Sequence, residues 1–173
     1  MGEYVLNSKK ICAIMAGIMI TSTILNPCAS YASANTTATT STTIGDSINE
    51  NSVYLSSLEY DTDATAAWNN YIAKDTNIDG GKISLKVDGE VVTFNKGMGA
   101  HATSYLVYDV SEYSDEYTRL SAYLGVDYTK AGLGGNGVKF NIYTSNDKKD
   151  WNLIEETDVI TADGNALYVD LNV

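Results

Sequence analysis

The stretch "KISLKVDGEVVTF", residues 82–94, has the pattern of two β-strands joined by a tight turn. Every second residue from Ile83 to Val87 is apolar, which places these side chains on one face of an extended strand. Asp88 and Gly89 follow, and this pair tolerates the positive φ that a two-residue hairpin turn requires. Because "EVVTF" supplies a second strand, the sequence predicts an antiparallel hairpin.

Three further runs repeat the apolar period of two, at residues 120–126, 138–142 and 167–173. The loops between the runs are rich in Gly, Asn and Asp, and a helix is expected only in short pieces, around residues 63–73. This pattern predicts an all-β protein, an antiparallel β-sandwich. The last run reaches the final residue, so we expect the sandwich to lack its last strands.

The N-terminus has the features of a secretory signal peptide, which we predict for residues 1–34. Lys9 and Lys10 precede an apolar run at residues 11–25, which is shorter than the roughly 18 to 20 residues that span a membrane. "ASA" follows, with cleavage expected after Ala34. The mature protein would be secreted, without membrane insertion. Both cysteines would leave with the signal, which excludes disulfides.

Residues 35–50 are predicted to be a Ser/Thr-rich linker, because they open with "NTTATTSTT" and contain no aromatic residue. Residues 51–173 would then form the folded domain. The formal net charge of the chain is −11. A surface this acidic repels nucleic acid and anionic membranes, so neither is expected as a partner.

Residues 75–86, "DTNIDGGKISLK", begin like a calcium loop, because Asp75, Asn77 and Asp79 alternate as oxygen donors. An EF-hand is excluded, since its twelfth position is Lys86 and a strand follows in place of a helix. Asp75 and Asp79 remain candidate ligands for a structural calcium of another geometry. The alternative is a turn that is rich in Asx residues.

His101 is the only histidine of the chain, and Gly97 and Gly99 precede it at the start of a predicted strand. Trp68 lies beside Asn69, and an exposed indole next to amides suits a sugar, whose ring stacks while its hydroxyls form hydrogen bonds. The alternative for both aromatic side chains is structural packing. No catalytic motif emerges, neither a nucleophile elbow nor an identifiable carboxylate pair, so this segment is not expected to be an enzyme.

Several segments, in order and spacing, resemble the novel putative carbohydrate-binding module, also called carbohydrate-binding module family 51. They are "YLSSLEY", Trp68-Asn69, "KDTNIDGGKISL", "FNKGMGAHATSYLVYDV", "RLSAYLGVDY" and "GGNGVKFNIYTSND". The resemblance implies a galactose-binding-like jelly roll, a non-catalytic role and attachment to a secreted glycoside hydrolase or a related surface enzyme of a Gram-positive bacterium. It also implies galactose or galactose-terminated glycans as ligands and a structural calcium at an Asp-Gly loop.

Carried over to this sequence, the resemblance makes His101 the first candidate for a sugar contact, followed by Trp68 and Asn69. Asp127 in "YLGVD" and Glu59 in "LEY" are further candidates. The chain would be a monomeric module tethered to a catalytic domain. Two alternatives stay open: an N-terminal accessory part of a glycoside hydrolase without its own working sugar site, or the domain of a surface adhesin.

Overall fold

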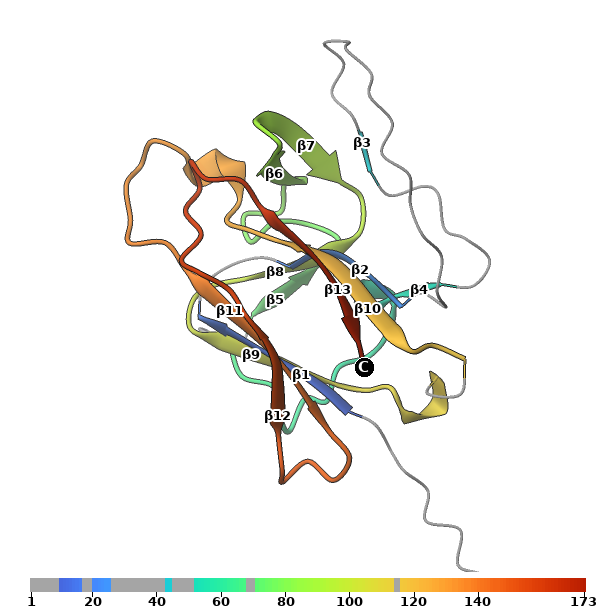
Figure 1. Ribbon diagram of the computed structural model, residues 1–173. Coiled ribbons are helices and arrows are strands. Elements are labelled where there is room, and N and C mark those ends of the chain that lie inside the picture. The colour runs from blue at the N-terminus through green and yellow to red at the C-terminus, as the bar shows by residue number, and fades with distance from the viewer. Residues whose placement is uncertain (1–9, 17–19, 26–42, 45–51, 68–70, 114–115) are drawn as a thin grey trace, which may run out of the picture.

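The computed structural model describes residues 10–16, 20–25, 43–44, 52–67, 71–113 and 116–173 (Figure 1). These residues form strands and three short 3₁₀ turns, η1 (Leu55–Ser57), η3 (Ser111–Tyr113) and η4 (Tyr128–Lys130). The described part contains no α-helix, and hence no helix with the length and hydropathy of a membrane span. The strands are β1 (Lys10–Ala16), β2 (Ile20–Leu25), β3 (Thr43–Ile44), β4 (Val53–Tyr54), β5 (Ile72–Lys74), β6 (Ile83–Val87), β7 (Glu90–Phe94), β8 (Gly97–Ala100), β9 (Ser104–Asp109), β10 (Arg119–Leu124), β11 (Lys139–Ser145), β12 (Asn152–Glu156) and β13 (Leu167–Asn172).

The predicted hairpin is confirmed as β6 and β7, which pair from Ile83 with Phe94 to Val87 with Glu90. Its turn has φ of 50° at Asp88 and 89° at Gly89, the left-handed values that a two-residue hairpin requires. The apolar face of the hairpin forms a small core of its own around Ile83 and Phe94, both fully buried. β3 pairs in parallel with β7 and completes a three-stranded sheet.

Two larger sheets face each other across the main core. One has the strand order β12-β11-β1-β9, and the other has the order β13-β10-β2-β8-β5 with β4 beside β2. Leu106 and Phe140 of the first sheet share a single buried cluster with Leu120, Leu124 and Val169 of the second. The predicted all-β sandwich is therefore confirmed in the described residues, although no strand among them joins the two sheets into a closed jelly roll.

The other predicted strands are found as β10, β11 and β13, with ends that differ from the predicted ones by at most three residues. β10 stops at Leu124, two residues before the predicted end, because the chain turns there toward the η4 turn. The short helix expected around residues 63–73 is not formed by the described residues of that segment. Ala66 makes an isolated bridge to Tyr105 instead, and Ile72 begins β5.

The segment predicted as a signal peptide contributes strands β1 and β2 to the two larger sheets. β1 lies between β11 and β9, and β2 lies between β10 and β8 (Figure 1). Cleavage after Ala34 stays a prediction, as do the linker at residues 35–50 and the domain boundaries. Such cleavage would take both strands out of the sheets.

Candidate functional site

His101 lies in the connection between β8 and β9, directly after the last residue of β8. Ala100 pairs with Ile72 of β5 in an antiparallel register. Continuing that register by one residue brings Tyr71 opposite His101. The Tyr71 side chain is 50% exposed and His101 is partly exposed. The backbones of Tyr71 and His101 therefore lie opposite each other at the end of the β5–β8 pair, and both residues are at least partly exposed. This end of the pair forms a rim of the sandwich.

The segment that precedes Tyr71 is fixed at both of its ends around the His101 connection. Ala66 and Tyr105 exchange two backbone hydrogen bonds of 3.0 and 2.8 Å on one side. β5 pairs with β8 on the other side. Trp68 and Asn69 lie outside the described residues, so their predicted sugar contacts stay predictions. The residues that flank them are nevertheless held on either side of His101.

Gly99 allows the loop at residues 75–81 to lie directly against β8. A Cβ atom at Gly99 would come within 2.8 Å of the Thr76 carbonyl oxygen, so another residue does not fit there without a shift. Asn77 is buried and closes the loop, because its Oδ1 accepts hydrogen bonds from the N–H groups of Asp79 and Gly81. This part of "DTNIDGG" is therefore the Asx-stabilised turn that the sequence left as one alternative.

Asp79 connects this loop to the η4 turn. Its Oδ2 lies 2.6 Å from Lys130 Nζ. The Lys130 ammonium holds the pKa of Asp79 below its usual range, and the nearby charge of His101 acts in the same direction. The same pair raises the pKa of Lys130. Asp79 thus joins the 75–81 loop, which packs against Gly99 of β8, to the η4 turn.

Asp75 faces a different cation. Its carboxylate lies 2.7 Å from Lys96 Nζ and accepts a hydrogen bond from Gly97 N at 3.1 Å. Burial raises the pKa of Asp75, but the contacts with Lys96 and Gly97 lower it, and the pKa lies below its usual value. Asp75 and Asp79 are therefore bound to separate lysines.

The described residues do not fit a calcium site as they are arranged. Nowhere among them do three acidic, histidine or cysteine side chains gather around one point. A cation held by Asp75 and Asp79 would have to displace Lys96 and Lys130. Calcium binding stays a prediction, and these contacts do not support it.

Asp127 is fully buried, in contrast to what a sugar contact requires. Its carboxylate accepts hydrogen bonds from Ser84 N and Thr129 N, each at 3.0 Å, and from the Thr129 hydroxyl. It caps the η4 turn and ties that turn to β6. In this arrangement Asp127 helps to position Lys130, and its carboxylate is already bonded within the protein.

Glu59 is exposed and lies 3.0 Å from Lys74 Nζ. The same ammonium donates to the Leu58 carbonyl at 2.7 Å. Lys74 pairs with Met98 of β8, so this contact ties Glu59 to the pairing of β5 with β8. A sugar contact by Glu59 stays a prediction.

Tyr71 is the residue that sequence reasoning missed. The chain has 13 tyrosines, and no local pattern separates this one from the others. The position of Tyr71 near His101 follows from the pairing of β5 with β8, and this pairing cannot be read from the sequence of either strand.

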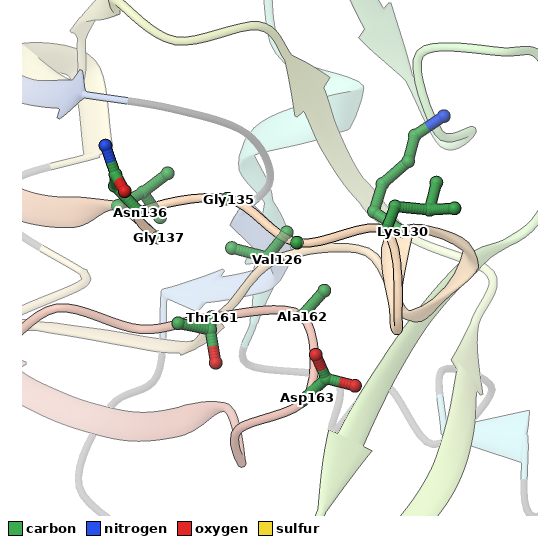
Figure 2. Close-up of a pocket in the computed structure, with 11 residues that line it drawn as sticks. Val126, Lys130, Gly135, Asn136, Gly137, Thr161, Ala162 and Asp163 are labelled. Carbon is green, nitrogen blue, oxygen red and sulfur yellow. The ribbon is translucent and has the colours of Figure 1, made fainter.

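An open hollow lies beyond Lys130, between the glycine-rich loop and residues 161–163 (Figure 2). Asn136 and Asp163 are polar groups at its border, and Gly132 N donates to the Asp163 carboxylate at 3.1 Å. Gly132, Gly134 and Gly137 of this loop have the spacing of a dinucleotide-binding fingerprint, but strand β11 follows them where that motif requires a helix, so the loop is not such a fingerprint. No aromatic side chain lines the hollow. It therefore offers a sugar no ring on which to stack.

Comparisons with known proteins give a consistent relationship. A carbohydrate-binding module of family 51 from a Clostridium perfringens GH95 protein, solved in complex with methyl-galactose, is 32% identical with a TM-score of 0.60. The match covers 69% of this chain and 77% of that one. A structure of the CBM51-2 and INT domains of Clostridium perfringens ZmpB is 28% identical with a TM-score of 0.57, over 68% of this chain and 24% of that one. A search of curated proteins finds no significant match.

The family model described as "NPCBM/NEW2 domain" matches residues 51–173. This range contains the hairpin, the rim around His101 and every described strand after β3. The chain is thus a member of the NPCBM/NEW2 family and carries a carbohydrate-binding module of the CBM51 type.

Proposed function

We propose that this chain is a non-catalytic module that binds galactose or galactose-terminated glycans. The observation that carries the proposal is the related Clostridium perfringens module in complex with methyl-galactose, which this chain matches over 77% of its length. The family match and the exposed aromatic and imidazole groups at the rim support it. A galactose-binding-like jelly roll is the architecture that we propose for the complete module.

The rim offers the two kinds of contact that a pyranose needs. Tyr71 supplies a ring on which the apolar face of the sugar stacks, and His101 binds its hydroxyls. From the sequence, Trp68 and Asn69 are the candidates for the same two roles. Recognition at such an open site is weak for one sugar, and several tethered copies would raise it.

In the cell, we propose a secreted or surface-held monomeric module that keeps a tethered glycoside hydrolase near galactose-containing glycans. The names of the two related structures, GH95 and ZmpB, show such modules in larger proteins. An accessory domain without a working sugar site and an adhesin domain remain the alternatives. The first predicts no sugar binding, and the second predicts a surface-anchoring signal in place of a catalytic domain.

Calorimetric titration of the full chain with methyl galactoside and with methyl glucoside tests the proposal, because these sugars differ only in one hydroxyl configuration. We expect binding of the galactoside alone, weakened about tenfold or more in His101→Ala and Tyr71→Ala. Tyr168→Ala is the matched control, since Tyr168 is 48% exposed, close to the 50% of Tyr71, but lies on β13. Absence of heat with both sugars, confirmed by NMR titration, would favour the accessory domain without a sugar site.

A further inference from the structure

Two interior positions in the larger sheets are filled by strands from outside the family domain at residues 51–173. All seven residues of β1 pair with β11, from Lys10 opposite Ser145 to Ala16 opposite Lys139. On its other side β1 pairs with β9, from Lys10 opposite Asp109 onward. β2 similarly pairs with β10, β8 and β4. Figure 1 shows both strands lying within the sheets.

The family domain has no other described strand for these positions. The far edge of β11 already pairs with β12. The far edge of β9 is bonded to residues 61–66, for example through the Asp61 N–H and the Val107 carbonyl at 2.7 Å. Without β1, the facing edges of β9 and β11 would lie about 9.6 Å apart, two strand spacings, which is too far for hydrogen bonds. Both edges would then present unpaired N–H and C=O groups.

The sequence of β1 does not have the alternation of its neighbours. Residues 11–16 read "ICAIMA", apolar at every position, whereas β11 alternates between buried Phe140 and Ile142 and partly exposed Asn141 and Tyr143. A strand without alternation has no side-chain pattern that fixes one register. Its fit therefore depends on backbone hydrogen bonds and length, the features by which donated strands complete an open sheet.

We propose that residues 51–173 form a strand acceptor and that strands β1 and β2 are its intramolecular donors. The acceptor consists of the facing edges of β9 and β11 and of β8 and β10. The two strands complete the sandwich as long as they stay attached, and their release opens both positions to another strand. The predicted signal cleavage is an event that would cause this release. The proposal is independent of the sugar site.

The test uses the full chain, produced without export so that residues 1–34 are retained, with a specific protease site inserted at residues 35–42. After cutting, native mass spectrometry should show both pieces as a 1:1 complex. Amide exchange should show that β9 and β11 stay protected, and an isotope-labelled peptide of residues 8–27 should replace the donor. Separation of the pieces with loss of protection and self-association also supports the acceptor, with a second copy as occupant. Separation that leaves a monomer with unchanged protection overturns the proposal.

A proline variant tests the donor strand in the uncut chain. Ile14 pairs with both Asn141 and Tyr105, so Ile14→Pro removes a backbone donor in the middle of a sheet, where proline does not fit. We expect the unfolding midpoint to fall by about 10 °C. Thr39→Pro in the predicted linker is the control and should leave the midpoint unchanged. Equal midpoints for both variants would overturn the proposal.

Discussion

Replacement of Asp127 by alanine tests whether this carboxylate holds the fold or contacts a ligand. The side chain is fully buried and accepts hydrogen bonds from Ser84 N and Thr129 N, each at 3.0 Å. Alanine leaves the Ser84 N–H without an acceptor beneath the turn, whereas exposed Thr129 can turn its N–H to water. Leaving the Ser84 N–H unpaired costs about 1 to 3 kcal/mol, and losing the bond to Thr129 N costs about 1 kcal/mol. We therefore expect the free energy of unfolding to fall by about 2 to 4 kcal/mol.

Such a loss is a large fraction of the free energy of unfolding of a domain, so urea unfolding followed by circular dichroism will resolve it. Glu90→Ala is the control, because Glu90 is an exposed carboxylate on β7, and it should change stability by no more than about 0.5 kcal/mol. Below the unfolding transition, Asp127→Ala should still bind galactoside. Equal stability of the two variants, together with lost galactoside binding in Asp127→Ala, would refute the structural role and return Asp127 to the sugar site.

Three further changes give separate expectations. Gly99→Ala should destabilise the fold and weaken galactoside binding, because the added Cβ would lie 2.8 Å from the Thr76 carbonyl oxygen. Calorimetric melting measures the stability and calorimetric titration measures the binding. An unchanged melting temperature would contradict the close approach of the loop to Gly99. Tyr108→Phe should leave stability unchanged or raise it by about 1 kcal/mol in urea unfolding, since the buried hydroxyl has no partner in the described residues; a clear loss would reveal one. The pKa of Asp75 lies below its usual 3.8, so its contact with Lys96 stabilises the fold above about pH 4 and is lost as the pH falls through the lowered value. Asp75→Asn should therefore be less stable than the parent at neutral pH, and the difference should shrink as the pH falls through the lowered pKa of Asp75. Thermal melts across this range measure the difference, and a constant difference would contradict the linkage.

The hairpin at residues 82–94 could be predicted because everything that determines it is local. Alternation sets the faces of both strands, and Asp88-Gly89 has the positive φ values that join them. The same period of two located β10, β11 and β13. The pairing of the strands could not be predicted. β10 and β13, for example, are separated by more than forty residues, and the sequence of neither strand specifies which strand it pairs with.

The candidate site shows the same division more sharply. His101 could be singled out because it is the only histidine and follows two glycines of a close-packed strand. Asp127 was expected to contact sugar, but its partner Ser84 lies 43 residues earlier, so its burial depends on how the turn docks on β6. Tyr71 gained its place from the register of β5 and β8. Contacts that depend on the pairing of distant strands cannot be recognised from the local sequence around the residues that make them.

The rim around His101 and the hollow beside the glycine-rich loop differ in the conformational entropy that the protein would lose when a ligand binds. The connection that carries His101 is flanked by the Ala66–Tyr105 bridge and by the pairing of β5 with β8, so its ends are already fixed. Gly132, Gly134 and Gly135 all have positive φ, and a Cβ on any of them would meet no atom within 4 Å. Such a loop has more conformations to lose on binding, which costs free energy that a single weakly held sugar cannot offset. The preformed rim, with its exposed ring and imidazole, is therefore the surface on which one pyranose can be held.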